Sequence, residues 1–293
     1  MSELPTLTPA PSRGPAGPAF SAPARRRRSS RALRWLAVAM IAAGALALAD
    51  GVVTLLWQEP ITALIGKFHQ DHLKGELAGV EAVRPDAAEQ HALAGIADER
   101  DRIAYLAARL QHTARNGHAI GRIVIPSIGA SYVMVYGTDT ADLESGPGFY
   151  TETTFPGIDG TTLIAGHRTT YLAPFRHIDS LRPGDQIHLQ MPYAHFTYTV
   201  VGHRVVQPQD VTAATAQVGY SRVVLSACTP LFSAAKRLLV FARLTRAVPV
   251  GPARYLTEGQ VPQPLIYPLT PPPRHELPAV LKSLGPYYVA PAT

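Results

Sequence analysis

Three residues of the chain have the side chains that acyl transfer through a thiol requires, and each lies at the end of a strand-like segment. Cys228, the only cysteine in 293 residues, ends an apolar run from Val223, and Arg237 follows nine residues later at the start of another. His167 ends a third apolar run, from Thr161. A thiol nucleophile needs an acid or base partner, and the carbonyl oxygen that it attacks needs a positive donor. Cys228, His167 and Arg237 would together supply these groups.

An N-terminal apolar segment predicts that the rest of the chain is exported. The stretch from Trp35 to Trp57 has one charged residue, Asp50, and would extend about 34 Å as a helix, against about 30 Å for a bilayer core. Residues 1–34 hold seven arginines and one acid, which predicts a cytoplasmic N-terminus. This excess equals the whole formal net charge of +6, so the neutral remainder argues against a nucleic-acid partner. A signal peptide cleaved after Ala49 is the alternative to a single-pass membrane anchor.

Composition and periodicity divide the chain into five parts: 1–32, 33–58, 59–118, 119–248 and 249–293. The first two are expected to be a disordered basic tail and the transmembrane anchor. The third is expected to be a helical stalk, with helices over 61–83 and 87–115, that packs on or leads to the main domain. The fourth has seven or more short strands, which predicts an all-β barrel or sandwich. The last is rich in proline, which breaks sheets.

Longer runs around the three residues resemble the sortases, most closely their class E. The similarity covers about residues 121–246 and consists of an AGHR run, an RPGD turn, and Cys-Thr-Pro with an arginine nine residues after the cysteine, in that order. It implies a closed eight-stranded β-barrel with short helices and a cell-wall sorting transpeptidase. By motif, the resemblance makes Cys228 the nucleophile, His167 the catalytic histidine and Arg237 the oxyanion-stabilising arginine.

The resemblance also implies the partners of the reaction. Its substrates would be surface proteins with a C-terminal LPxTG-like or LAxTG-like sorting signal, cleaved between Thr and Gly. The acceptor would be a peptidoglycan precursor or another cell-wall amine. No cofactor is expected, and no metal, because no metal-binding motif is present. Four neighbours of the catalytic residues are expected to contact the substrate: Thr169, Tyr171, Ala227 and Thr229.

Other functions remain open on the residues alone. One is a pilus-type sortase that polymerises subunits. Another is a different cysteine acyl-transferase or hydrolase such as an L,D-transpeptidase, although that family has His and Gly directly before its cysteine, where this chain has Ser226 and Ala227. The third is a membrane-tethered β module without activity, in which Cys228 is a small core residue. An inert Cys228 should resist thiol alkylation in the folded protein.

Overall fold

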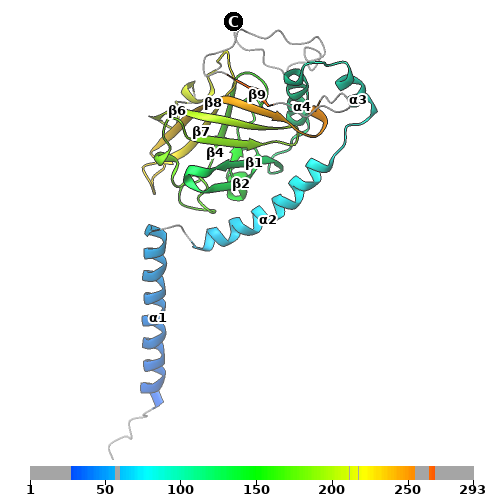
Figure 1. The fold of residues 1–293 in the computed structure, drawn as a ribbon. Helices are drawn as coiled ribbons and strands as arrows, with labels where there is room; N and C mark the ends of the chain where they lie inside the picture. The colour runs from blue at the N-terminus through cyan, green and yellow to red at the C-terminus, as the bar shows by residue number, and fades with distance from the viewer. Residues whose placement is uncertain (1–27, 57–59, 211, 217, 255–263, 268–293) are drawn as a thin grey trace, which may run out of the picture. The chain divides into compact units, whose positions relative to one another are not determined.

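The computed structural model describes residues 28–56, 60–210, 212–216, 218–254 and 264–267 (Figure 1). The chain divides into two compact units, residues 1–49 and 50–293. Among the described residues, one helix is long and apolar enough to cross a membrane. It is α1 (Arg28–Leu56), whose segment Arg31–Val53 has a mean hydropathy of 2.2 and no burial. A signal sequence meets the same criterion, so both N-terminal predictions are compatible with α1; the predicted tail up to residue 27 lies outside the described residues.

Eight strands form a closed barrel, which confirms the predicted fold class. Their order is β6-β5-β1-β2-β3-β4-β7-β8, and β8 pairs with β6 to close the sheet. Two neighbouring pairs are parallel, β2 with β3 and β4 with β7, and the others are antiparallel. The bounds are β1 (Ala119–Ile125), β2 (Ala130–Tyr136), β3 (Gly148–Phe149), β4 (Thr161–Ala165), β5 (Gln186–Gln190), β6 (Ala194–Val206), β7 (Arg222–Thr229) and β8 (Lys236–Pro249).

The proline-rich C-terminal part contributes one strand that the sequence did not predict. Strand β9 (Leu265–Ile266) pairs antiparallel with β8 at Arg246 and Ala247. The expectation that nothing after residue 248 joins the sheet is therefore wrong at this point. Leu265 and Ile266 lie between prolines at 264 and 268, so both can pair without a proline inside the strand. The rest of the predicted tail, 255–263 and 268–293, lies outside the described residues.

Alternation along the strands fills the barrel interior with large apolar side chains. Phe149 and Phe155 meet edge to face with ring centroids 4.5 Å apart, and both are fully buried. Phe196 and Tyr198 of β6 belong to the same core. Successive residues of a strand point to opposite faces of a sheet, so the residues between these core positions face outward. This alternation decides which residues at the strand ends can meet a substrate.

Helices precede the barrel and are inserted between its strands. The α-helices after α1 are α2 (Pro60–Ala82), α3 (Ala87–Ala94), α4 (Glu99–Thr113), α5 (Thr140–Ser145) and α6 (Thr212–Thr215), and the 3₁₀ turns are η1 (Pro126–Ile128), η2 (Ile178–Ser180) and η3 (Gly251–Ala253). The sequence predicted one helix over 87–115, but the structure has two. Gly95 caps the end of α3, and Asp98 begins α4 by accepting a hydrogen bond from the backbone of Arg100 at 2.8 Å.

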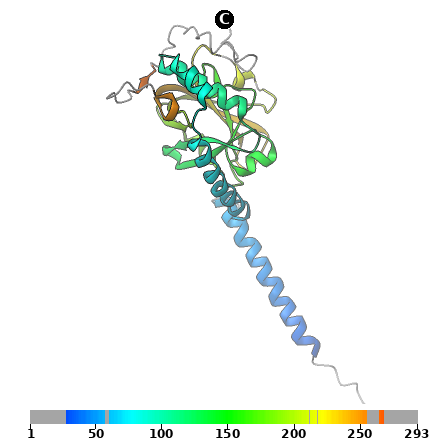
Figure 2. The ribbon, with the colours of Figure 1, turned by 90° about the vertical axis from the view of Figure 1, so that its right-hand side faces the viewer.

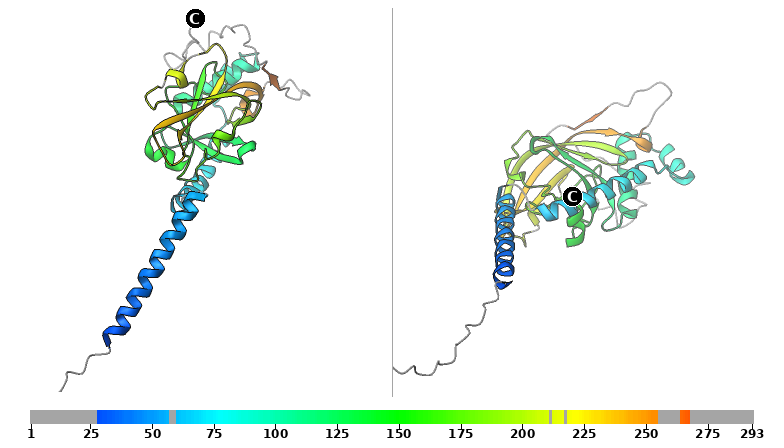
Figure 3. Two further views of the ribbon diagram at one scale, coloured as in Figure 1. Left: turned by 90° about the vertical axis from the view of Figure 1, so that its left-hand side faces the viewer. Right: turned by 90° about the horizontal axis from the view of Figure 1, so that it is seen from below.

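The helices before the barrel pack against it. Ile103 and Ala107 of α4 are part of the barrel core, and Figure 2 shows α4 lying against the sheet. Leu73 and Leu77 of α2 pack on β1 and β2, and the right-hand view of Figure 3 shows α2 running along the barrel. These helices therefore belong to the compact unit of residues 50–293.

A buried glutamine fixes the register of α2 on the sheet. The side-chain amide of Gln70 donates to the carbonyl of Val133 at 2.9 Å, and its oxygen accepts from the Val133 N–H at 2.8 Å. The neighbouring strand β3 first pairs with β2 at Val135, so Val133 has no strand partner on that side. Gln70 is 4% exposed and supplies both missing hydrogen bonds. The amide thus anchors α2 to the strand at one defined position.

Candidate active site at the ends of three strands

The sheet brings the three predicted catalytic residues to the same end of adjacent strands. Cys228 of β7 pairs directly with Arg237 of β8. On the other side of β7, Ala165 of β4 pairs in parallel with Ser226, and the Gly166 N–H continues this ladder by donating to the Ser226 carbonyl at 3.1 Å. His167 and Cys228 each lie two residues beyond that pair. The order across the sheet is therefore His167, Cys228, Arg237.

The alternation of β7 places the thiol on the outer face of the barrel. Leu225 and Ala227 belong to the interior core, whereas Val224 belongs to a separate outer cluster with Leu163 and Leu239. Cys228 has the same parity as Val224 and therefore the same face. The thiol is free and partly exposed. A nucleophile in this position is open to a substrate that lies on the outside of the barrel.

Arg237 is held from one side and keeps donors available. Its Nη1 donates to the carbonyls of Ala234 at 3.0 Å and Lys236 at 3.2 Å. Within the described residues, Nε and Nη2 have no hydrogen-bond partner. A guanidinium fixed in this way retains charge and N–H groups for an oxygen that becomes negative. This is the property that the predicted role in oxyanion stabilisation needs.

His167 is partly buried, and one of its ring nitrogens has no partner in the described part of the chain. Its Nε2 is inaccessible and has no hydrogen-bond partner among the described residues, while its backbone carbonyl accepts from the Phe175 N–H at 3.0 Å. Burial lowers the pKa of His167, because the charged imidazolium loses hydration. The carboxylate of Glu144 opposes this and raises the pKa of the same group. An imidazole without a competing partner is free to exchange a proton with a bound substrate.

Tyr171 connects His167 with Glu144. Its ring lies 5.5 Å from the imidazole, centroid to centroid, and its hydroxyl donates to Glu144 Oε1 at 3.0 Å. Tyr171 and the next two residues, Leu172 and Ala173, have φ values of 48°, 66° and 43°. Three consecutive non-glycine residues in the left-handed region are strained, at about 1–3 kcal/mol each. The loop after His167 is therefore held in an unfavourable conformation by its contacts.

Arg168 ties this loop to the strand that carries the thiol. Its side chain is buried, and Nη1 donates to the carbonyl of Cys228 and to Thr229 Oγ1, both at 3.4 Å. Nη2 forms an ion pair with Asp179 at 2.7 Å and donates to the Arg176 carbonyl at 3.1 Å. Arg168 thus contacts both parts of the site through the backbone and has a structural role there.

The four predicted substrate contacts fall into different environments. Thr169 and Tyr171 are partly buried in the loop after His167, and Thr229 is partly exposed beside Cys228. Ala227 is 3% exposed and points into the barrel core. Because Ala227 and Cys228 face opposite sides of the sheet, this placement argues against a direct contact of Ala227 with a substrate.

Two residues near the site were not singled out from the sequence. Tyr150 follows β3, and its N–H donates to the Leu163 carbonyl at 3.0 Å, which brings it to the outer face. Burial raises the pKa of Tyr150, the positive charge of Arg237 lowers it, and Glu152 and Cys228 make smaller raising contributions. The second is Glu144 on α5. Tyr150 and Glu144 come close to the site because strands that are distant in the sequence are neighbours in the sheet. No local sequence pattern reveals this arrangement.

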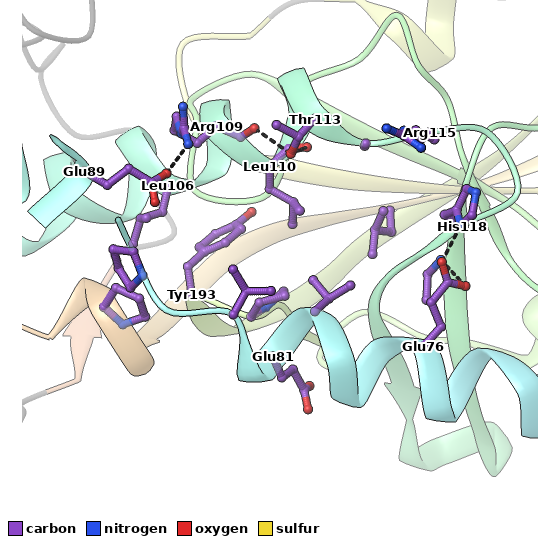
Figure 4. Close-up of a pocket in the computed structure, with 18 residues that line it drawn as sticks. Glu76, Glu81, Glu89, Leu106, Arg109, Leu110, Thr113, Arg115, His118 and Tyr193 are labelled. Atoms are coloured by element: carbon purple, nitrogen blue, oxygen red, sulfur yellow. Dashed lines mark hydrogen bonds and ion pairs between the residues drawn. The ribbon is translucent and has the colours of Figure 1, made fainter. Parts of the chain in front are cut away.

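A separate pocket of about 440 Å³ lies between α2, α4 and the barrel (Figure 4). Two ion pairs border it, Glu76 with His118 and Glu89 with Arg109. None of the predicted site residues lines it. Among the described residues, no group of three or more His, Cys, Asp or Glu side chains could hold a metal ion. The chemistry suggested by the sequence is therefore located at the strand ends and not in this pocket.

A closed β-barrel with Cys, His and Arg at neighbouring strand ends defines a class of protein suited to acyl transfer through a thiol. Residues 123–245 match the family model of the sortase domain. The chain is similar to Sortase D of Bacillus subtilis, with 35% identity over 43% of this chain and 64% of the relative. It is also similar to Sortase SrtE1 of Streptomyces coelicolor, with 31% identity over 29% of this chain and 27% of the relative.

The chain is also similar to a solved structure. The SrtF sortase from Corynebacterium diphtheriae is 26% identical, with 47% of this chain and 90% of that chain covered and a TM-score of 0.45. The chain spans less than two thirds of the length of the curated relatives that it matches. These two relatives are named Sortase D and Sortase SrtE1, so the matches do not single out one class.

Proposed function

We propose that this chain is a membrane-anchored sortase that cleaves a C-terminal sorting signal and transfers the protein to a cell-wall amine. One observation carries the proposal. Cys228 pairs with Arg237, and Cys228 and His167 each lie two residues beyond the paired Ser226 and Ala165 of neighbouring strands. All three candidate residues lie within the segment that matches the sortase model. The free, partly exposed thiol is the nucleophile, Arg237 stabilises the oxyanion, and His167 transfers the proton.

The reaction has two halves. In the first, the Cys228 thiolate attacks the Thr carbonyl of the Thr–Gly bond, and Arg237 donates hydrogen bonds to the oxygen that becomes negative. His167 in its charged form gives its proton to the departing glycine amine, which leaves a thioester on Cys228. In the second, an amine attacks the thioester and gives up a proton to His167. The thiolate and the imidazolium are thereby restored.

The finer assignments belong to the same proposal. We assign the enzyme to class E on the motif resemblance and on the similarity to SrtE1, and therefore expect it to prefer LAxTG-like over LPxTG-like signals. The acceptor is a peptidoglycan precursor or another cell-wall amine. Ser226 and Ala227 before the nucleophile argue against an L,D-transpeptidase.

Topology is the remaining part of the proposal. Helix α1 is an uncleaved single-pass anchor, with the N-terminus in the cytoplasm and the barrel outside. Its support is the arginine-rich tail before the helix and the continuation of the apolar run after Asp50. Protease added to intact protoplasts should remove the barrel. Recovery from the medium of a mature form that starts at Asp50 would instead establish a cleaved signal peptide.

The enzymatic proposal is tested by trapping the thioester. Full-length protein in detergent is incubated with LAETG and LPETG peptides, and mass spectrometry searches for a mass increase on the chain equal to the peptide truncated after Thr. The adduct should form on the wild type, disappear with hydroxylamine, and be absent in Cys228→Ala. Because the chain has one cysteine, no other thiol can account for the adduct. Cleavage that persists in Cys228→Ala would defeat the proposal.

A further inference from the structure

Helix α2 exposes an apolar stripe along its first half. Ile61, Leu64, Ile65 and Phe68 are 67%, 57%, 41% and 67% exposed. Their spacing of three and four residues places them on one face of the helix. The opposite face is the one that packs on the barrel through Gln70. The stripe is therefore turned away from the domain and is covered by none of the described residues.

The rest of the described unit shows no comparable concentration of exposed apolar side chains. From residue 69 onward, the described residues expose five large apolar side chains, two from β6 and three from other segments: Val201 and Val205, and Val83, Phe232 and Ile266. Scattered exposed apolar residues need no explanation, but four on one helix face mark an interaction surface. The stripe also ends early. The same face continues with His72, Gly75 and Gly79, which offer little apolar surface.

The position of the stripe in the chain indicates what covers it. The apolar segment of α1 ends at Val53, and Ile61 follows eight positions later. Eight Cα-to-Cα steps span at most about 26–29 Å when fully extended, so the stripe lies close to the point where the chain leaves the bilayer. Trp57 lies in this interval, and tryptophan is typical of membrane interfaces. Exposed Lys67 adds a positive charge beside the stripe.

We propose that the stripe Ile61, Leu64, Ile65 and Phe68 docks α2 onto the surface of the membrane in which α1 is anchored. The apolar face would enter the boundary between headgroups and acyl chains, as interfacial amphipathic helices do. This inference rests on the membrane anchor of the proposed function. It adds a second attachment point, so that the catalytic unit is oriented on the bilayer instead of moving freely on a linker.

The same helix contacts the loop that follows His167. Thr62 Oγ1 accepts a hydrogen bond from the Tyr171 N–H at 3.1 Å. A Cβ at Gly66 would lie 3.1 Å from Leu172 Cγ and 3.1 Å from the Tyr171 carbonyl carbon, so a larger residue there would require the loop to shift by a few tenths of an ångström. The loop thus touches one side of α2 while the stripe occupies the other. Since a helix with its side chains is about 10–12 Å across, docking would hold the loop close to the membrane surface.

The depth of α2 in a bilayer tests the proposal directly. Cys228→Ala removes the only thiol, so one cysteine can be placed at will in the full-length chain. Phe68→Cys reports on the stripe, and Ala78→Cys, also exposed but ten residues further along α2, is the matched control. Each carries a bimane label and is reconstituted in nanodiscs at one protein per disc, which excludes contacts between copies. Brominated acyl chains should quench the label at position 68 at least fivefold more than at 78, and aqueous iodide should show the reverse.

The alternatives give different results. Equal iodide quenching at both positions, with protein that resists carbonate extraction, would overturn the docking and leave the anchor intact. Protein that is extracted by carbonate would overturn the anchor and the docking together. The label at position 68 could instead be protected from iodide in detergent only at high protein concentration, and be unprotected in single-copy discs. That result would overturn membrane docking and show that a second copy of this chain covers the stripe. None of these outcomes depends on transpeptidation, so they are distinct from a failure of the enzymatic proposal.

A second set of variants separates docking from folding. With the label at Ile65→Cys, the three other stripe residues are changed together to serine. Because all three are more than half exposed, the melting temperature in detergent should not fall. Acyl-chain quenching at position 65 should fall at least fivefold. Retained quenching in this variant would show that the apolar side chains do not hold the helix on the membrane.

Discussion

Two arginines in different parts of the molecule have contrasting surroundings. Arg102 of α4 is 7% exposed and is surrounded by backbone acceptors. Its guanidinium donates to five carbonyls, those of Leu93, Ile96, Pro252, Ala253 and Arg254. It therefore joins α3, α4 and the segment after β8. Arg237 at the strand ends uses one nitrogen for two carbonyls of its own loop, and within the described residues its other donors have no partner.

The difference separates a structural from a functional use of the same side chain. A buried guanidinium is favourable only when its donors are satisfied, as they are at Arg102. At the strand ends, polar groups are left incomplete: Arg237 keeps free donors, and His167 Nε2 is buried without a partner among the described residues. Unsatisfied groups cost stability, and a substrate can supply what they lack. The first region should therefore respond to mutation in stability and the second in rate.

The largest effect is expected at Arg237. Arg237→Ala should lower kcat/KM for peptide cleavage about 10²–10³-fold, as loss of one oxyanion donor does. Arg237→Lys should recover only part of the rate, since an ammonium keeps the charge but loses the planar fork. Steady-state kinetics and a thermal melt measure both quantities. The melting temperature should be nearly unchanged, and a large drop in stability with a normal rate would reverse the comparison.

Arg102 should give the opposite pattern. Arg102→Met keeps much of the aliphatic packing but leaves five carbonyls without their donor, which should lower the free energy of unfolding by about 2–4 kcal/mol. For a domain of this size, the corresponding fall in melting temperature is roughly 4–16 °C. The activity of the protein that remains folded should stay close to wild type. A specific loss of kcat in fully folded Arg102→Met would show that the two regions are coupled.

The pH profile sharpens the assignment of His167. The active form needs a thiolate together with an imidazolium, and burial lowers the pKa of His167 from its ordinary value. Its titration therefore forms the ascending limb of kcat/KM against pH. Glu144 raises the pKa of His167, so Glu144→Gln should lower that pKa while its amide oxygen still accepts from the Tyr171 hydroxyl.

Two changes follow from a lower pKa of His167. The ascending limb should move to lower pH, and the plateau should fall, because a smaller fraction of His167 carries the proton in the active pH range. Both effects should be smaller than the loss in Arg237→Ala. Glu152→Gln removes a nearby exposed carboxylate that does not act on His167, and it should leave the limb in place. A limb that moves to higher pH in Glu144→Gln would contradict the assignment.

The strands and the three catalytic candidates rest on local signals, so the sequence predicted both. The strand pattern left a sandwich open, however, and the closed barrel came from the resemblance to sortases. Strand length and turns could be read directly; the RPGD turn, for example, has Gly184 at a φ of 101°, where glycine is favoured. Closure by β6 and β8, and the two parallel pairings, depend on partners far apart in the chain. Tyr150 and Glu144 were missed for that reason. The sequence also did not show that the Ala227 side chain points into the barrel. Which residues of β7 face inward is decided only when β7 pairs with its neighbours in the sheet.

Ala227 provides the finest test of the comparison, since it lies one residue from the nucleophile but faces the core. The sequence predicts a substrate contact for Ala227. In the structure, the side chain is 3% exposed and packs among interior residues. Ala227→Thr adds a methyl and a hydroxyl to a filled core, so it should destabilise the fold by about 1–3 kcal/mol.

No gain in turnover is expected from Ala227→Thr, because the hydroxyl would lie on the opposite side of the sheet from the thiol. Peptide cleavage and thermal melts of Ala227→Thr and of Ala227→Val, which adds similar volume without a hydroxyl, measure the two effects separately. Equal, unchanged kcat in both variants with lower melting temperatures would assign position 227 to the structural region. A rise in kcat for Ala227→Thr alone would group this residue with the catalytic strand ends. A core residue would then affect the rate as well as the stability.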